Sequence, residues 1–299
     1  MGPGARRSRP QGRPSPMSRN NRIALMLLAP SALFLVIFFA WPMVQAILLA
    51  VRDDDGFTLS YLNRMVDDRN FGPALRNTAA IIILVIPLQF ILALIMALVV
   101  SAKLKGSKTL LYIFAVPIAV SDLAAGIVWF SIFNESGFLN TFLANVGAVA
   151  AGERVFWLSS ANEWRLLGTV VVAEVWRATS IVFVILLAGL QSIPEDYDEA
   201  AQVFGASFWD RLWRVKLPLL RPSIQVALIL RTILAFQIFA VVIALTGGAT
   251  RVLSLEAFTW YRRLQNEHVA AAYAALILVI SMIVAWIYLR TIRTQERQQ

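Results

Sequence analysis

Six long apolar stretches restrict the fold of this chain more than any other feature of its sequence. A helix needs about 20 mostly apolar residues to cross a bilayer, and backbone groups in lipid must bond internally, which favours helices. Charged residues make up only 15% of the chain, against about 25% in soluble domains. We therefore predict an all-α, polytopic membrane protein with six transmembrane helices. The predicted spans cover roughly residues 23–51, 77–101, 109–133, 167–190, 223–246 and 268–289.

The distribution of lysine and arginine predicts the orientation of these spans. The span ends that include both termini carry 16 of these residues, and the opposite ends carry 9. Because basic residues concentrate on the cytoplasmic side, both termini are expected in the cytoplasm. Residues 1–21 are polar, without apolar periodicity, and are predicted to form a disordered cytoplasmic tail. Residues 291–299 form a second, shorter tail. The net charge of +9 thus indicates topology and not a nucleic-acid partner.

Prolines and a polar insert interrupt the apolar pattern. Pro42 interrupts the first and longest stretch, where we expect a kink or a projecting end. The insert, residues 191–222, separates the fourth and fifth spans on the predicted cytoplasmic side. Within it, Ser192 followed by Glu195 has the spacing of a capping box, and Ser207 followed three residues later by an aspartate has the same spacing. This pattern predicts a rigid pair of short helices joined by a turn.

The insert carries a motif that resembles a known signature. Its residues are Glu199-Ala200-Ala201, three further residues, Gly205, nine further residues and then Val215-Lys216-Leu217-Pro218. This order is similar to the EAA signature of ABC importer permeases, with a valine in place of the usual isoleucine. Gly205 also suits the left-handed conformation that ends a helix. One departure is Phe204, which stands where the family commonly has an aspartate.

The similarity extends over residues 22–290, which we interpret as one transmembrane permease domain. The segments Ala29–Pro42, Ala173–Asp196 and Thr246–Ile280 resemble the carbohydrate-uptake branch, of maltose and multiple-sugar type. The resemblance is to the inner-membrane components of binding-protein-dependent transport systems. It implies a multi-pass protein of the bacterial cytoplasmic (inner) membrane.

The family resemblance also implies partners and a coupling site. In that family the loop contains a coupling helix, here roughly Pro194–Phe204, which docks into a groove on a cytoplasmic ATPase subunit. The implied partners are a second, homologous permease chain, two ATPase subunits that bind ATP and Mg²⁺, and an extracytoplasmic solute-binding protein, besides membrane lipid. The ATPase-coupling residues would be Glu199, Ala200, Ala201, Gly205, Leu217 and Pro218.

Four ionisable residues fall within predicted spans, where charges are costly and often functional. Asp122 lies in the third span, Glu174 and Arg177 in the fourth, and Arg231 in the fifth. At about 1.5 Å rise per residue, Asp122 and Arg177 reach similar depths and could pair between helices. Glu174 and Arg177 are three residues apart and could instead pair within one helix. These residues either line a polar path for substrate or form a static ion pair buried between subunits.

Aromatic and amide side chains are further candidates for the substrate path: Trp129, Trp176, Gln237 and Tyr273. Aromatic faces can stack on sugar rings, and the same side chains also pack in cores and mark membrane interfaces. The sequence leaves both roles open.

Several kinds of chemistry are excluded by composition. The chain has no cysteine and one histidine, His268, which leaves neither thiolate chemistry nor an imidazole cluster for a metal. It also lacks a G-x-x-x-x-G-K-[ST] phosphate loop, so nucleotide must bind a different chain. We therefore predict no catalytic residue, no metal and no cofactor bound by this chain, which makes it a transport subunit and not an enzyme.

The resemblance favours a sugar or an oligosaccharide as the transported solute. An importer permease for glycerol phosphate or a polyamine is the nearest alternative. An ion-coupled secondary carrier is a more distant one, because such a carrier needs no ATPase and therefore no coupling helix.

Overall fold

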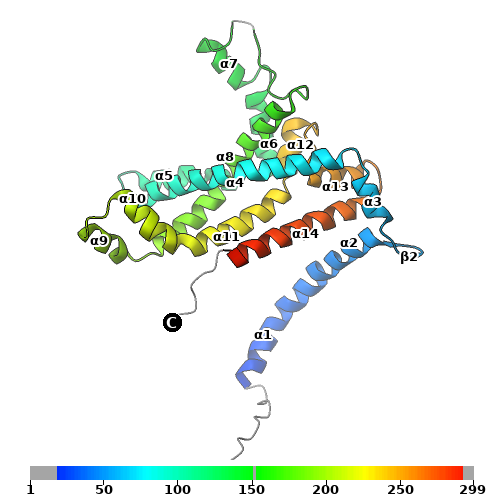
Figure 1. Cartoon of the computed structure of the whole chain (residues 1–299), viewed down its shortest axis with the longest axis horizontal. Coiled ribbons are helices and arrows are strands. Elements are labelled where there is room, and N and C mark those ends of the chain that lie inside the picture. The colour runs from blue at the N-terminus through cyan, green and yellow to red at the C-terminus, as the bar shows by residue number, and fades with distance from the viewer. Residues whose placement is uncertain (1–18, 151–152, 292–299) are drawn as a thin grey trace, which may run out of the picture. The chain divides into compact units, whose positions relative to one another are not determined.

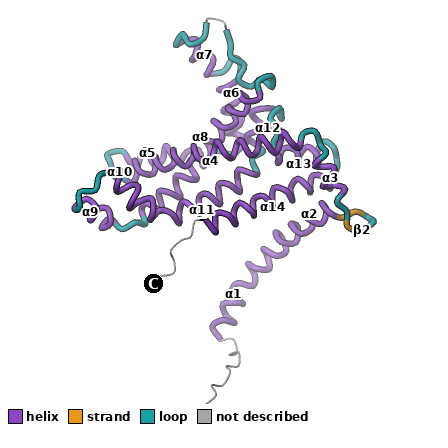
Figure 2. Tube along the Cα trace, in the orientation of Figure 1, coloured by secondary structure: helices purple, strands orange, loops and turns teal. Residues whose placement is uncertain are grey.

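The computed structural model describes residues 19–150 and 153–291. These residues fall into two compact units, divided between Leu48 and Leu49. Helices dominate the described residues, and one short strand pair is present among them (Figures 1 and 2). The all-α prediction is confirmed. The two predicted tails lie mostly outside the described residues, although the first helix begins at Arg19, inside the range predicted as tail.

The first unit is a long apolar helix with a π-helical turn. α1 (Arg19–Leu35) leads into η1 (Val36–Ala40), and α2 (Trp41–Val51) continues from it. Pro42 cannot donate a backbone hydrogen bond to the turn before it. The wider turn lies directly before this proline, and the N–H of Trp41 bonds to the carbonyl of Val36. The irregularity expected near Pro42 is therefore a π turn.

Four long helices form the frame of the second unit: α4 (Phe71–Ser101), α8 (Glu163–Gln191), α11 (Leu217–Phe236) and α14 (Glu267–Thr291). α8 packs against α4 and α11, and α11 also packs against α14 (Figure 1). The remaining elements of this unit are β1 (Arg52–Asp53), β2 (Gly56–Phe57), α3 (Ser60–Val66), α5 (Ser107–Ala115), η2 (Val116–Ala119), α6 (Asp122–Phe133), α7 (Phe138–Asn145), α9 (Glu195–Val203), α10 (Phe208–Arg211), η3 (Leu212–Lys216), α12 (Ala240–Thr246) and α13 (Leu253–Arg262). β1 and β2 pair antiparallel.

The lengths of these helices agree with a polytopic membrane protein. Among the described residues, 5 helices are long and apolar enough to cross a membrane, and a sixth span results if one bent pair is counted. The large apolar side chains of the first unit are exposed, with Leu27 at 75% and Phe38 at 63%. Such surfaces suit contact with lipid tails.

The third predicted span is not one helix. The segment over residues 109–133 breaks after η2, and its two halves are bent by 102°. Val120 and Ser121 are extended at the break, and Ser121 Oγ accepts a hydrogen bond from the N–H of Ala124 at 3.2 Å. A serine that caps a new helix therefore ends the straight apolar run.

The fifth predicted span, residues 223–246, is also wrong in its limits. α11 begins six residues earlier, at Leu217, and ends at Phe236; α12 follows after a break at residues 237–239. The hydroxyl of Ser254 donates a hydrogen bond to the carbonyl of Ile238 within the break. The break is thus stabilised by a side chain that comes later in the chain.

The C-terminal halves of the two broken spans, α6 and α12, pack directly against each other. A Cβ placed on Gly126 of α6 would lie 2.6 Å from the Cβ of Ala244 in α12. The absence of a side chain at this position is therefore what permits the close approach of the two helices.

Candidate functional site

A buried cluster of charged side chains connects α6, α8 and α11. Arg177 Nη1 lies 2.7 Å from Asp122 Oδ1, and Arg177 Nη2 donates to Glu174 Oε1 at 2.8 Å. Arg231 Nη2 donates to the same Glu174 oxygen at 2.7 Å. The two pairings that the sequence offered as alternatives for Arg177 are therefore both present.

Glu174 and Arg231 form the sealed end of this cluster, with side chains that are each 1% exposed. Gln89 of α4 supports both, because its Oε1 accepts from Arg231 Nε at 2.6 Å and its Nε2 donates to the Glu174 carbonyl at 2.8 Å. Buried charges need partners of this kind. Arg231 Nη1 is buried without a hydrogen-bond partner among the described residues.

The cluster opens towards the contact between α6 and α8. The exposed fraction rises from 1% at Glu174 to 13% at Arg177 and 52% at Asp122. On the same two helices, the rings of Trp129 and Trp176 meet edge to face with their centroids 6.1 Å apart. α6 and α8 therefore share two contacts, an indole pair and an ion pair. Aromatic faces can stack on a sugar ring, and charged groups can bond its hydroxyls.

Two of the predicted substrate-path residues lie elsewhere. Tyr273 is fully buried in the core that packs around α14, and its hydroxyl donates to Asp68 Oδ2 at 3.2 Å. Trp260 Nε1 donates to the same oxygen at 2.9 Å. Gln237 follows the last residue of α11, and its side chain is exposed. The structure therefore does not bring Tyr273 or Gln237 into the charged cluster.

The polar insert contains the two short helices that the sequence predicts. α9 lies within the range Pro194–Phe204 in which the first of these helices was expected, and Gly205 after it has a left-handed backbone with φ of +77°. Ser207 Oγ accepts from the N–H of Asp210 at 3.2 Å and caps α10 as expected. The capping box at Ser192 is wrong: its hydroxyl donates back to the carbonyl of Gly189 at 2.7 Å. Free carbonyls at the end of α8 attract this donor, because the last turn of a helix has unpaired carbonyl groups.

The predicted ATPase-coupling residues lie on the accessible side of the insert. Glu199, Ala200 and Gly205 are exposed, whereas Ala201, Leu217 and Pro218 are half-buried. Phe204, the departure from the signature, is 90% exposed. A large apolar side chain with this exposure suits a surface that another protein covers.

Ion pairs that were not predicted from the sequence connect α9 to neighbouring segments. Asp198 Oδ2 accepts from Arg211 Nη1 at 2.9 Å, and Asp198 Oδ1 lies 3.4 Å from Lys216 Nζ. At the start of α9, Glu195 accepts a hydrogen bond from Lys103, which follows α4. This bond holds the pKa of Glu195 below its usual range. The sequence contains one signal for these ion pairs: acidic residues in one short helix are followed by cations in the next.

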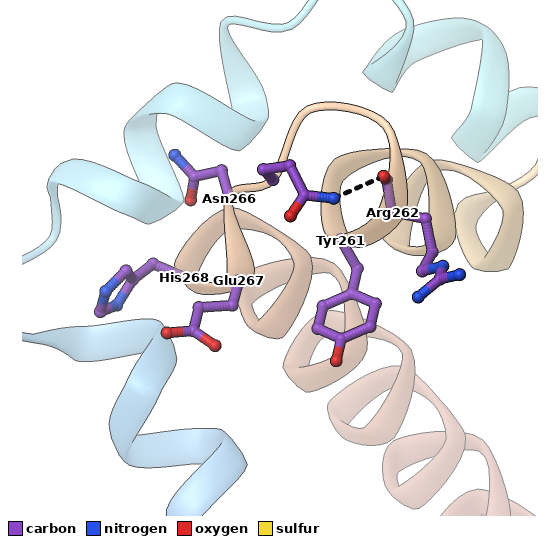
Figure 3. A pocket seen from close by; sticks show the side chains of 6 residues that line it. Tyr261, Arg262, Asn266, Glu267 and His268 are labelled. Carbon is purple, nitrogen blue, oxygen red and sulfur yellow. Dashed lines mark hydrogen bonds between the residues drawn. The ribbon is translucent and has the colours of Figure 1, made fainter.

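The turn between α13 and α14 forms a separate polar pocket of about 560 Å³ (Figure 3). Gln265 Nε2 donates a hydrogen bond to the carbonyl of Arg262 at 2.7 Å. None of the predicted site residues lines this pocket. Its lining residues are Tyr261, Arg262, Gln265, Asn266, Glu267 and His268.

These packed, partly broken spans and the short exposed helix between α8 and α11 define a polytopic membrane permease fold. A bacterial ABC transporter involved in the import of the acidic polysaccharide alginate contains a chain of this fold, with a TM-score of 0.78 and 20% identity. The match covers 93% of the present chain and 98% of that chain. The bacterial alginate ABC transporter in complex with alginate pentasaccharide-bound periplasmic protein matches with a TM-score of 0.75, 20% identity and coverage of 92% and 95%.

Sequence comparison identifies the family. Residues 89–293 match the model described as "Binding-protein-dependent transport system inner membrane component". The trehalose transport system permease protein SugA of Mycobacterium tuberculosis is 32% identical, over 90% of this chain and 88% of that protein. The trehalose/maltose transport system permease protein MalF of Thermococcus litoralis is 31% identical, over 91% and 94%. The sn-glycerol-3-phosphate permease protein UgpA of Brucella abortus is 28% identical, over 89% and 92%.

The chain therefore belongs to the family of binding-protein-dependent transport system inner membrane components. It is a membrane-spanning transport subunit of an ABC importer and not an enzyme. The resemblance to ABC importer permeases is confirmed, and the ion-coupled secondary carrier is excluded as an interpretation.

Proposed function

We propose that this chain imports a neutral sugar or a short oligosaccharide, delivered by an extracytoplasmic solute-binding protein. The observation that carries this proposal is the similarity along about nine tenths of the chain to permeases of trehalose and trehalose/maltose systems. The importer would also contain a second permease chain and two ATPase subunits that bind ATP and Mg²⁺. Both termini and α9 would face the cytoplasm, as the distribution of Lys and Arg favours.

The charged cluster supports a neutral solute over glycerol phosphate. Relatives that transport sn-glycerol 3-phosphate are 28% and 30% identical to this chain, which makes that solute the second candidate. A phosphate group needs cations or backbone donors that are free to bind it. Here the guanidinium groups of Arg177 and Arg231 are matched by the carboxylates of Asp122 and Glu174. The cluster has no net charge, which suits the hydroxyl groups of a sugar.

Within this proposal the cluster residues have different roles. Asp122 and Arg177, at the more exposed end of the cluster, would meet the solute, and so would the pair of Trp129 and Trp176 on the same two helices. Glu174 and Arg231 are sealed and would hold Arg177 in position.

Coupling would pass through the insert. Closure of the ATPase pair on ATP would move α9, with Glu199 as a charged contact and Gly205 as the turn that sets the helix angle. The spans from the third to the sixth would then rock and open the cavity outward. The exposure of Glu199 and the left-handed backbone of Gly205 support these roles.

The first test is purification of the tagged chain in mild detergent, with identification of the proteins that co-elute. We expect an ATPase and a second permease. The complex is then reconstituted in proteoliposomes with its binding protein, and uptake of labelled trehalose, maltose and glycerol 3-phosphate is compared. Uptake of glycerol 3-phosphate without either sugar would replace the proposed solute by the second candidate.

The coupling site has its own test. Glu199→Lys reverses the charge of an exposed residue, so expression and membrane insertion should be normal while uptake is abolished. Asp53→Lys, in the exposed loop at β1, is the matched control and should leave uptake intact. Normal uptake by the Glu199→Lys variant would remove Glu199 from the coupling surface.

A further inference from the structure

We propose that Asp198 is a positioning residue, which transmits the movement of α9 to the span that begins at η3. This inference rests on the proposed function of α9 as the helix that an ATPase moves. Asp198 is a different residue from Glu199, the proposed contact with the ATPase. The inference assigns the mechanical connection between α9 and η3 to ion pairs of one carboxylate with two cations.

The contacts single out Asp198 among the acidic residues of α9. Its carboxylate lies 2.9 Å from Nη1 of Arg211, the last residue of α10, and 3.4 Å from Nζ of Lys216, the last residue of η3. The three side chains are 20–27% exposed, so each is largely covered by protein. One carboxylate therefore links α9 to two points on the adjoining helical segment.

The other ion pair of α9 is more exposed to solvent. The pair formed by Lys103 and Glu195 has side chains that are 78% and 72% exposed, and exposed pairs of this kind contribute little. The backbone on either side of α9 consists of the short segments 192–194 and 204–207. A partly buried, two-point ion pair is the more rigid link, because its charges are less screened by water and salt.

The segment that receives the force continues directly into a span. η3 ends at Lys216, and α11 begins at the next residue, Leu217. The same helix carries Arg231, which bonds to Glu174 in the charged cluster. A displacement of Asp198 would thus move α11 along its length, over about 22 Å between Lys216 and Arg231 at about 1.5 Å per residue.

Adjacent residues of α9 would then serve separate purposes. Successive side chains of an α-helix point about 100° apart. Glu199 is exposed and available to a partner, whereas Asp198 is half-buried and contacts its own chain. Loss of Glu199 should therefore weaken attachment to the ATPase, and loss of Asp198 should leave attachment intact but disconnect it from the spans.

The test compares Asp198→Asn with Asp198→Glu in the complete reconstituted complex. The asparagine removes the charge at nearly constant size, and the glutamate retains it. Arg211→Gln is a second variant that removes the same link from the other side. Arg214→Gln is the matched control, because Arg214 is on the same segment with an 82% exposed side chain and one 3.5 Å contact to Asp210.

Two measurements are made on each variant. The first is the number of labelled trehalose molecules imported per ATP hydrolysed, together with the amount of ATPase that co-purifies. The second needs no solute: spin labels at Asp196→Cys and Val226→Cys report the distance distribution between α9 and α11 in the presence of ATP and vanadate. The natural chain has no cysteine, so within this chain the labels attach only at these two positions.

For Asp198→Asn and Arg211→Gln we expect a normal amount of bound ATPase, a several-fold fall in transport per ATP, and a broadened distance distribution. Asp198→Glu and Arg214→Gln should behave like the unmodified chain. A narrow, unmodified distribution in Asp198→Asn would overturn the inference, and so would loss of the ATPase from that variant. Failure of the unmodified chain to bind any ATPase would instead reject the proposed function.

Discussion

The ion pair between Glu174 and Arg231 predicts an asymmetric response to mutation. In Glu174→Gln, the charge of Arg231 remains buried without a carboxylate opposite it: the amide oxygen of the glutamine and Gln89 Oε1 are neutral acceptors, and Nη1 has no hydrogen-bond partner among the described residues. Breaking a buried pair by removal of one partner costs about 3–5 kcal/mol. Arg177 is less affected, since it keeps its 2.7 Å contact with Asp122.

The opposite single variant should cost less. In Arg231→Met, Glu174 keeps the 2.8 Å hydrogen bond from Arg177, and the group left without a partner is Oε1 of Gln89. An unsatisfied neutral polar group costs about 1–3 kcal/mol. The double variant contains no unpaired buried charge at this position. We expect it to be more stable than Glu174→Gln alone, with a coupling energy of about 2 kcal/mol, inside the usual range for residues in one network.

The measurement is unfolding of the purified chain in mixed micelles with increasing dodecyl sulfate, followed by the fluorescence of its 9 tryptophans. Gln225→Leu is the control: it removes a buried amide of α11 whose hydrogen bond to Tyr288 is long, at 3.4 Å, and should change stability little. Equal losses in the two single variants, with strict additivity in the double variant, would refute the unequal roles of Glu174 and Arg231.

Two further predictions concern helix packing and pH. Gly189→Ala should destabilise the protein, because a Cβ at this position would lie 2.2 Å from the hydroxyl of Ser223. Gly168→Ala on the same helix meets no atom within 4 Å and should stabilise by up to about 1 kcal/mol through helix propensity; the reverse order in dodecyl sulfate unfolding would contradict this packing. Burial raises the pKa of Glu256, with Arg251 acting in the opposite direction. Its contribution to stability is therefore present below the ordinary carboxyl pKa, near 4.3, and is lost as pH rises through the raised value. Glu256→Gln should lack that loss. The difference in melting temperature, variant minus unmodified chain, should therefore increase from acidic to neutral pH. A decrease would show that the ion pair with Arg251 outweighs the burial of Glu256.

The sequence was sufficient to predict the all-α, polytopic class and the approximate positions of the long apolar helices, because each requires only a long apolar run. It did not predict where two of these runs break. The break near Ile238 depends on a hydrogen bond from Ser254, which is 16 residues away in the chain. The break at Ser121 had a local signal, a serine with capping potential, but an uninterrupted apolar run on both sides obscured it. Breaks of this kind depend on tertiary partners for the freed backbone groups.

The charged cluster shows a different limit of prediction from sequence. Spacing within one helix was enough to anticipate the pair of Glu174 and Arg177, and depth was enough to suggest Asp122 as a partner between helices. These alternatives seemed exclusive, yet a guanidinium has five donors in a planar fork and can serve two carboxylates at once. The position of Tyr273 needed the fold itself, because an aromatic residue in a span can face lipid, a cavity or the core. The ionisable residues were therefore the more predictable candidates: a charge within a span requires a partner, whereas an aromatic ring does not.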